Sequence, residues 1–309
     1  MAKVSIVIVS MNNLSNLDIC LPSIEKYTST PHKIYVVAYL FSEENLKILR
    51  KKYPYIEIIE SNEIRGFSEN NNLALKKVDT DFTFVLNDDT EFREPVLDKL
   101  LTALKNTKEA TIMSPVLQRG DGSIQFHGRR KYTFFSFMKG QLGFRKHGSS
   151  KYEYQKGIYK TYNISGAAFL IPTAVFSKLG FFDERYFFCP EDIALSTLLN
   201  KKGYNCYVDS DTTIIHYEGV SSKKSKLFYA TTIVADLGES YFYGDNICKR
   251  ICILCLWIYK IIALSMLNIL SPTQHRKDYL YIYKQTFNAY FHSKMTKEVF
   301  INEYNKVNL

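Results

Sequence analysis

The chain of 309 residues lacks the patterns of several protein classes. It has no helix-turn-helix, zinc-finger or Arg-rich pattern, which argues against nucleic acid as a partner despite a formal net charge of +9. No signal peptide is visible, because the apolar start over Val4–Val9 is too short, so we expect a cytoplasmic location. The C-x-x-C of Cys252 and Cys255 has no second pair and no nearby His. We therefore interpret the cysteines as buried apolar residues, without a metal or redox role.

The chain also has no long apolar run that is free of charge. Cys248–Leu270 is strongly apolar, but Lys260 falls near its middle, where a membrane span tolerates charge poorly. Its polar residues share one half of the helical wheel, which favours a helix lying in a membrane interface. Residues 220–309 hold 12 Lys/Arg against 6 Asp/Glu, whereas residues 1–219 hold 28 against 25. A basic excess of this kind suits an anionic membrane surface.

We therefore predict that residues 221–309 form a basic, aromatic, helical region that binds the inner face of the cell membrane peripherally. The Tyr and Phe residues of 279–291 are typical of a membrane interface. Two alternatives remain open: a helical subdomain that packs on the rest of the chain, and a dimer interface.

Residues 1–220 show the pattern of an α/β domain. Strands are predicted over Val4–Ser10, Lys33–Tyr39, Ile56–Glu60 and Phe82–Leu86, and each is followed by a helical pattern. This alternation predicts a Rossmann-like, mostly parallel sheet flanked by helices. Beyond about residue 107 the rhythm changes to shorter strands, and residues 131–157 are predicted to form a long loop. The later strands are expected over 111–118, 123–127, 164–171, 204–208 and 213–217.

The strand over Phe82–Leu86 ends in Asn87, Asp88 and Asp89. Carboxylates at the carboxyl end of a buried strand stand where open α/β sheets bind ligands. Adjacent carboxylates repel, and a cation between them relieves the repulsion. The pattern therefore predicts Mg²⁺ or Mn²⁺ bound by oxygen ligands together with a substrate diphosphate. The alternative is a solvated acidic turn that caps the helix beginning near Glu94.

Other polar positions follow the predicted strands at the same edge. Gly66 precedes a helix whose N-terminus favours a phosphate, although an ordinary helix start gives the same pattern. The three residues Asn70–Asn72 disfavour a helix interior, which amides facing a ligand would explain. Glu191 and Asp192 follow an aromatic segment that can raise the pKa of a carboxyl group and make it a base; simple helix capping is the alternative. His216 after the last strand is a structural residue unless a metal is bound nearby.

In this order the motifs resemble the inverting nucleotide-sugar glycosyltransferases of family 2, whose fold is called GT-A, and especially bacterial rhamnosyltransferase-like members. The likeness covers about residues 3–222. It rests on the opening strand Val4–Asn12, the N-x-x-x-G-F-x-x-x-N-N stretch of Asn62–Asn72, the L-N-x-D-T form of the D-x-D motif over Leu86–Thr90, the S-G-A segment Ser165–Ala167, the G-x-F-D-E…E-D segment Gly180–Asp192, and the closing motif His216–Gly219.

The resemblance implies a role for each matching residue. Asp89 would bind Mg²⁺ or Mn²⁺ with His216 as a further contact, and Asp192 would be the general base with Glu191 beside it. The acceptor side would include Gly166 and Ala167. The donor nucleotide sugar would contact Ser10, Asn12, Tyr39, Gly66, Asn71, Asn87 and Asp88.

The implied reaction is a single in-line displacement that inverts the anomeric centre. The donor would be a UDP- or dTDP-sugar, and the acceptor a hydroxyl of a growing cell-surface glycan or lipid-linked oligosaccharide. The bound metal would neutralise charge on the leaving diphosphate.

One departure from the family concerns the donor base. After the second strand the family usually has an Asp, and this chain has Ala38 there. Tyr39 or Glu43 would have to contact the base instead. Ala38 supports the alternative of a non-catalytic glycan- or membrane-binding protein on a transferase fold, which the presence of both Asp89 and Asp192 opposes. A nucleotidyltransferase is the other alternative, but the loop Met11–Leu14 is not a Gly-rich, Lys/Arg-bearing loop.

Overall fold

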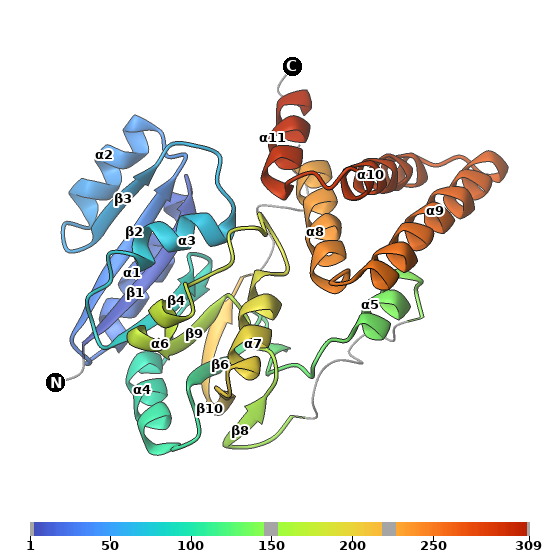
Figure 1. The fold of residues 1–309 in the computed structure, drawn as a ribbon. Helices are drawn as coiled ribbons and strands as arrows, with labels where there is room; N and C mark the ends of the chain where they lie inside the picture. Colours follow the sequence, from blue (N-terminus) through green and yellow to red (C-terminus); the bar gives the residue numbers. More distant parts are fainter. Residues whose placement is uncertain (1–2, 145–153, 218–226, 308–309) are drawn as a thin grey trace. The chain divides into compact units, whose positions relative to one another are not determined.

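The computed structural model describes residues 3–144, 154–217 and 227–307, and the chain divides into two compact units (Figure 1). The first, here called the sheet unit, comprises Met1–Lys131, Ser150–Asp183 and Glu191–Glu218. The second, the helical unit, comprises Tyr132–Ser149, Glu184–Pro190 and Gly219–Leu309. The helical unit therefore takes two short segments from within the first 220 residues.

The sheet unit is built on one mixed sheet in the order β3-β2-β1-β4-β9-β6-β10-β5, with β7 paired to β6 and β8 to β10. The predicted α/β fold is confirmed. The first four strands pair in parallel, as predicted, and β6 pairs in parallel with β10. Strand β9 lies between β4 and β6 and runs antiparallel to both. The strands are β1 (Val4–Met11), β2 (His32–Tyr39), β3 (Glu57–Ser61), β4 (Phe82–Asn87), β5 (Thr90–Glu91), β6 (Ile112–Gln118), β7 (Ile124–Phe126), β8 (Ile158–Thr161), β9 (Ala168–Pro172) and β10 (Cys206–His216).

Helices cover both faces of this sheet (Figure 1). Successive side chains of a strand point to opposite faces, so Ile6 and Ile8 of β1 pack in the core under α1, α2 and α4, whereas Val7 packs in the core under α3, α6 and α7. Burial on both faces explains the continuous β-branched runs of these strands. The helices are α1 (Leu14–Tyr27), α2 (Glu43–Lys52), α3 (Phe67–Leu75), α4 (Val96–Asn106), α6 (Thr173–Lys178) and α7 (Glu191–Lys201).

The strand register brings several chain segments to one edge of the sheet. Tyr39 at the end of β2 lies opposite both Met11 and Ser61, the last residues of β1 and β3. Val9 lies opposite Asn87, and the antiparallel β9 begins beside the end of β4, with Ala168 opposite Leu86. The loops after β1, β2, β3 and β4 and the segment before β9 therefore share this edge.

Three local predictions need correction. β10 is one strand of 11 residues, where we expected two, because a bulge between Asp209 and Thr213 accommodates the polar residues of the apparent break. The short strands β5 and β8 were not predicted, and both exist by pairing with β10. The predicted loop over 131–157 is wrong for α5 (Phe134–Gln141), while residues 145–153 lie outside the described residues.

The helical unit combines α5 with α8 (Phe228–Tyr243), α9 (Ile247–Leu270), α10 (Gln274–Phe291) and α11 (Thr296–Val307). Its core includes Trp257 of α9, which is fully buried and donates a hydrogen bond from Nε1 to Ser240 Oγ of α8 at 3.1 Å. Phe137 of α5 stacks on Tyr243 of α8 with ring centroids 4.8 Å apart. Such contacts stabilise α5, whose short sequence has no strong helical signal of its own.

The expectation that the cysteines are buried is wrong for those of α9. Cys248, Cys252 and Cys255 are all exposed, whereas Cys20 and Cys206 are buried in the sheet unit. The helix buries its opposite side, which carries Ile253 and Trp257.

Candidate functional site

The turn after β4 is fixed by backbone and side-chain contacts. The Asn87 N–H donates to the Ala167 carbonyl at 2.9 Å, and Thr90 Oγ1 donates to the Asn87 carbonyl at 2.8 Å. Thr90 then pairs with His216 in the β5–β10 ladder, and the Tyr217 N–H donates to the Asp89 carbonyl at 2.9 Å. The short strand β5 therefore places Asp89 beside His216, although 126 residues separate them in the chain.

The side chains of Asp89 and His216 face each other. Asp89 Oδ1 lies 3.1 Å from His216 Nε2, and the two side chains are 21% and 10% exposed. His216 Nδ1 lies 2.8 Å from Gln125 Oε1, so in the tautomer with its proton on Nδ1 the ring donates to Gln125 and Nε2 carries a lone pair. The amide of Asn87 is 3.4 Å from Nε2, in position to donate to it. Asp89 Oδ1 is buried and accepts no hydrogen bond from the described residues.

These residues fit a divalent cation. Two electron-rich atoms 3.1 Å apart match the spacing of adjacent ligands on an octahedral ion, about 3 Å when each bond is about 2.1 Å. The hydrogen bond from His216 Nδ1 to Gln125 is the kind of outer contact that orients a ligating imidazole. Among the described residues no group of three His, Cys, Asp or Glu could hold a metal. A cation here would therefore rely on diphosphate oxygens and water for its other ligands.

Asp88 points to the other side of the turn, toward α1. Its Oδ1 accepts a hydrogen bond from Asn16 Nδ2 at 3.2 Å. The pKa of Asp88 is raised to about 6: burial is the largest cause, hydrogen bonds from Ser10 and Asn16 oppose it, and the charge of Asp89 adds to it. The two adjacent carboxyl groups are thus held in different surroundings.

The residues predicted to contact the donor base lie at the ends of β1 and β2. Asn12 has a positive φ of 49°, and its Oδ1 accepts from the Ser42 N–H at 3.1 Å and from Asn45 Nδ2 at 2.9 Å. This arrangement ties the β1 loop to the start of α2. Tyr39 is largely buried, and its hydroxyl accepts from the Arg65 N–H at 3.3 Å. Ala38 is fully buried, so it presents no polar group to this edge.

The start of α3 is satisfied from within the chain. Glu69 Oε2 accepts from the Gly66 N–H at 3.2 Å, which is the one half of a capping box that a glycine N-cap allows. For Asn70 and Asn72 the expectation of a bound ligand needs correction: Asn70 Nδ2 donates to the Arg65 carbonyl at 3.1 Å, and Asn72 bonds both the carbonyl and the N–H of Phe182. Asn71 is buried too, and its Nδ2 donates to the Phe67 carbonyl at 2.9 Å.

Asp192 lies at the start of α7, next to the acceptor-side segment. A Cβ built on Gly166 would stand 3.6 Å from Asp192 Cβ, so the two residues are in direct contact. Burial raises the pKa of Asp192, while the charge of Arg129 and the N–H groups of Ile193 and Gly166 lower it. Glu191 beside it is buried. The aromatic residues Phe187 and Phe188 belong to the helical unit.

Two contacts connect the acid-bearing segments. Asn87 bonds Ala167 through the backbone, and the neighbouring Gly166 touches Asp192. The turn that carries Asp89 and the helix start that carries Asp192 therefore lie at the same edge of the sheet unit.

Sequence reasoning missed two side chains of this region, Gln125 and Arg129. Gln125 lies 2.8 Å from His216 Nδ1, and the positive charge of Arg129 lowers the pKa of Asp192. The backbone of Arg129 is fixed by Thr161 Oγ1, which accepts its N–H at 3.0 Å, and by the N–H of Asn163, which donates to its carbonyl at 3.0 Å. Nothing in the sequence around the hairpin distinguishes these two polar residues from ordinary surface positions.

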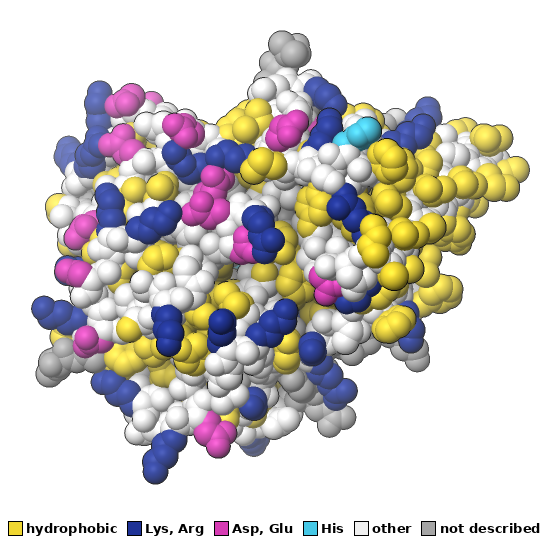
Figure 2. All heavy atoms as spheres, viewed as in Figure 1, with side chains coloured by type: hydrophobic (Ala, Val, Ile, Leu, Met, Phe, Trp, Pro, Cys, Tyr) yellow, Lys and Arg dark blue, Asp and Glu magenta, His cyan; other side chains and the backbone are white. Residues whose placement is uncertain are grey.

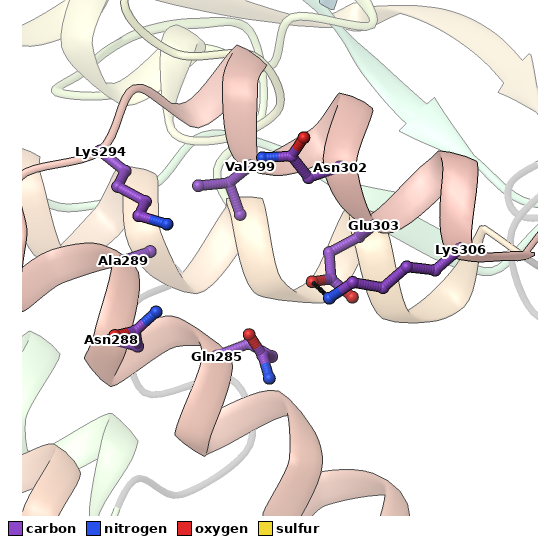
Figure 3. A pocket seen from close by; sticks show the side chains of 8 residues that line it. All are labelled: Gln285, Asn288, Ala289, Lys294, Val299, Asn302, Glu303 and Lys306. Atoms are coloured by element: carbon purple, nitrogen blue, oxygen red, sulfur yellow. Dashed lines mark hydrogen bonds and ion pairs between the residues drawn. The ribbon is translucent and has the colours of Figure 1, made fainter.

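A pocket in the helical unit is distinct from these residues. It lies between α10 and α11, and none of the predicted site residues line it. Figure 3 shows its lining, including the ion pair in which Lys306 Nζ lies 2.6 Å from Glu303 Oε1. Because Glu303, the carboxylate that lines the pocket, is ion-paired with Lys306, we do not assign a catalytic role to this pocket.

Several known proteins are similar to this chain. It is 25% identical over 163 residues to the O-antigen biosynthesis protein RfbC of Myxococcus xanthus, covering 50% of this chain and 12% of RfbC. It is 27% identical over 155 residues to the N-acetylglucosaminyl-diphospho-decaprenol L-rhamnosyltransferase of Mycobacterium tuberculosis (strain CDC 1551 / Oshkosh), covering 46% of this chain and 48% of that protein. The chain thus spans less than half the length of these relatives.

Solved structures share the fold at low sequence identity. The structure of GalNAc-T7 with UDP, GalNAc and Mn²⁺ matches with a TM-score of 0.58 and 16% identity, over 79% of this chain and 50% of that one. The mannosyltransferase PcManGT from Pyrobaculum calidifontis, in complex with GDP-Man and Mn²⁺, matches with a TM-score of 0.55 and 13% identity, over 99% and 87%. The family model described as glycosyl transferase family 2 matches residues 5–180, and the chain therefore belongs to that family.

Proposed function

We propose that this glycosyltransferase transfers a sugar from a UDP- or dTDP-sugar to a hydroxyl of a growing cell-surface glycan or lipid-linked oligosaccharide, with inversion. The observation that carries the proposal is the pairing of Asp89 Oδ1 with His216 Nε2 at the edge that also bears Asp192. One part of this edge suits a cation and a diphosphate, and the other holds an enclosed carboxyl group beside a small-residue segment.

The names of the relatives support the finer identity of donor and acceptor. A rhamnosyltransferase that acts on N-acetylglucosaminyl-diphospho-decaprenol favours a deoxyhexose donor and a lipid-linked acceptor. An O-antigen biosynthesis protein points to the same class of surface glycan. An acceptor carried by a lipid would place the enzyme peripherally at the inner face of the cell membrane.

The chemical step needs one base on the acceptor side. The ionised carboxylate of Asp192 takes the proton of the acceptor hydroxyl while that oxygen forms a bond to the anomeric carbon. The bond from the anomeric carbon to the diphosphate oxygen breaks on the opposite side, which inverts the centre and releases a nucleoside diphosphate. Burial raises the pKa of Asp192, which makes its carboxylate a stronger base than an ordinary one, and the positive charge of Arg129 favours the ionised form.

Asp89 and His216 would hold Mg²⁺ or Mn²⁺ on the donor side. The cation supplies charge neutralisation for the leaving diphosphate. Gln125 would orient the imidazole so that Nε2 is available to the cation, while Asn16 of α1 donates to Asp88 on the other side of the turn. The solved neighbours of this fold hold Mn²⁺ with UDP or GDP-Man, which supports a divalent metal without distinguishing Mn²⁺ from Mg²⁺.

A donor screen tests this proposal. Purified protein is incubated with UDP- and dTDP-sugars, Mg²⁺ or Mn²⁺, and a short-chain N-acetylglucosaminyl-diphospho-polyprenol, and the released nucleoside diphosphate is measured. We expect acceptor-dependent release with one donor class, and loss of kcat by a factor of about 10²–10⁴ in Asp192→Asn with donor binding retained. Wild-type turnover in Asp192→Asn would refute the assignment of the base. Donor binding without release from any donor would favour the non-catalytic alternative.

A further inference from the structure

The outward side of α9 is an apolar stripe that runs the length of the helix. Its exposed residues recur at spacings of four, four and three, which keeps them on one side of a helix with 3.6 residues per turn. None of them is charged. We call this set the α9 face: Ile247, Ile251, Cys255, Ile258, Ile262, Met266 and Ile269, flanked by Cys248, Cys252, Tyr259, Leu267 and Leu270.

The area that this face exposes is unusual for a water-facing helix. Ile247 is 68% exposed, and Ile269 and Leu270 are each 81% exposed. A helix of 24 residues is about 36 Å long, so the stripe forms a continuous apolar surface well beyond a scattered hydrophobic residue. Figure 2 shows these hydrophobic side chains gathered over the region of α9.

The opposite side of α9 fixes its rotation. Ile253, Leu256 and Trp257 are buried within the helical unit. Lys260 follows them: its Nζ donates to Gln141 Oε1 at 2.6 Å and stands 4.0 Å from the Tyr283 ring centroid and 4.5 Å from that of Trp257. The one charge in the middle of the helix is therefore turned inward, toward protein partners.

This packing decides between two membrane arrangements. By length and composition α9 is, among the described residues, the one helix that could span a bilayer. A spanning helix would need α8 and α10, which pack against it, to enter the hydrocarbon too, and α10 carries Arg276, Lys277 and Lys284. An α9 that lies in the plane of the interface exposes only its apolar side to lipid and leaves these cations at the headgroup level.

The charge of the residues around α9 indicates which kind of surface the α9 face binds. Residues 245–298 contain eight Lys/Arg and three Asp/Glu, a net charge of +5. Lys277 near the start of α10 is exposed, and Lys249 in the first turn of α9 reaches solvent while it is ion-paired with Asp245 at 2.8 Å. Each such cation close to an anionic leaflet contributes about 1 kcal/mol to binding. An apolar stripe bordered by cations fits a lipid surface with negative headgroups.

A second copy of the chain fits the same face less well. A left-handed coiled coil requires a 3.5-residue repeat, whereas the exposed positions of α9 follow an average spacing of about 3.67, so this face does not form the seam of a left-handed coiled coil.

We propose that the α9 face is an in-plane membrane-binding surface, with its apolar stripe in the acyl boundary of an anionic leaflet and its rotation fixed by the inward Lys260. The proposal concerns where the protein binds and does not depend on catalysis. Vesicle binding is measured without donor or acceptor, so its failure and a failure of the proposed function are distinguishable.

Co-sedimentation with vesicles tests the proposal directly. The full chain is mixed with vesicles of phosphatidylcholine alone or with phosphatidylglycerol added. We expect binding mainly to the anionic vesicles, and a loss of at least about tenfold in Ile258→Ser/Ile262→Ser, because two inserted side chains lose their apolar contacts. The matched control is Ile48→Ser on α2, since Ile48 is 42% exposed and Ile258 45% exposed. The control should bind as the wild type does.

Three outcomes would overturn the proposal. The wild type could fail to bind anionic vesicles, the double variant could bind as the wild type does, or the double variant could change a dimer to a monomer in sedimentation without changing vesicle binding. The last result would assign the face to a second copy of the chain. An unchanged unfolding temperature in the double variant shows that it folds.

The depth of spin labels distinguishes an in-plane helix from a span. Nitroxide labels are placed one at a time on Ile251→Cys, Ile258→Cys and Ile269→Cys in a variant in which Cys189, Cys248, Cys252 and Cys255 are replaced by Ala. On anionic vesicles we expect all three labels at similar, shallow depths. A label at 258 that lies much deeper than those at 251 and 269 would show a spanning helix and contradict the proposal.

Discussion

Two carboxyl groups of the candidate site differ in what surrounds them. Asp89 Oδ1 lies 3.1 Å from His216 Nε2, and this buried oxygen accepts no hydrogen bond from the described residues. Asp192 is enclosed beside Gly166 and receives backbone N–H groups. The environment of Asp89 favours a bound cation, and the environment of Asp192 increases the basicity of its carboxylate. Different surroundings therefore suit two identical side chains to different roles.

Arg129 should set the pH range in which Asp192 works. Its positive charge lowers a pKa that burial raises, and Glu191 is the adjacent acid on α7. In Arg129→Gln the pKa of Asp192 should rise, so that the base becomes protonated at a higher pH. We expect the acid limb of the kcat/KM profile to move to higher pH, while Arg129→Lys, which keeps the charge, should stay nearer the wild type. An unmoved acid limb in Arg129→Gln would contradict this electrostatic role.

At the scale of elements, the side chain of Asn72 on α3 is hydrogen-bonded to the turn before α7. Asn72 is 2% exposed, its Nδ2 donates to the Phe182 carbonyl at 2.9 Å, and its Oδ1 accepts the Phe182 N–H at 3.1 Å. Asn72→Ala leaves two buried backbone groups without these partners, which should cost about 2–4 kcal/mol of unfolding free energy. Urea denaturation measures the loss.

The matched control for that substitution is Asn106→Ala. Asn106 is the exposed last residue of α4, so its replacement should change the unfolding free energy by no more than about 0.5 kcal/mol. Equal losses in the two variants would show that the pair of hydrogen bonds to Phe182 has no special weight.

The elements that could be predicted from the sequence are those whose periodicity reflects their own burial. The first four strands and their helices have continuous apolar runs or helical spacing, so their pattern alone indicates them. β5, β8 and α5 depend on partners distant in the chain, such as β10 for the strands and Tyr243 for Phe137 of α5. The local sequence does not indicate those partners, so β5, β8 and α5 could not be predicted from it.

The candidate site divides in the same way. Asp89 follows a strand and Asp192 begins a helix, and each belongs to a motif that can be recognised in the sequence. Gln125 and Arg129 acquire their roles only because the β6–β7 hairpin and the β10 ladder bring them beside His216 and Asp192. The Asn run was misread for a related reason, since Asn72 and Phe182 are 110 residues apart.

At the scale of the whole molecule, two surfaces of different chemistry belong to two different units. The sheet unit carries all the candidate site residues, and its family membership identifies it as a glycosyltransferase domain. The helical unit carries the α9 face and much of the basic excess. This division allows each surface to be altered without touching the other, so membrane binding and transfer can be tested as separate properties.

The central claim is that Asp89 and His216 bind a cation together with the donor diphosphate, while Asp192 serves the acceptor. Mn²⁺ binding measured by electron paramagnetic resonance, with and without UDP or dTDP, tests it most directly. We predict that the nucleotide strengthens Mn²⁺ binding equally in the wild type and Asp192→Asn, and that Asp89→Asn weakens it by at least about tenfold. Unchanged Mn²⁺ binding in Asp89→Asn, or its loss in Asp192→Asn, would contradict the account.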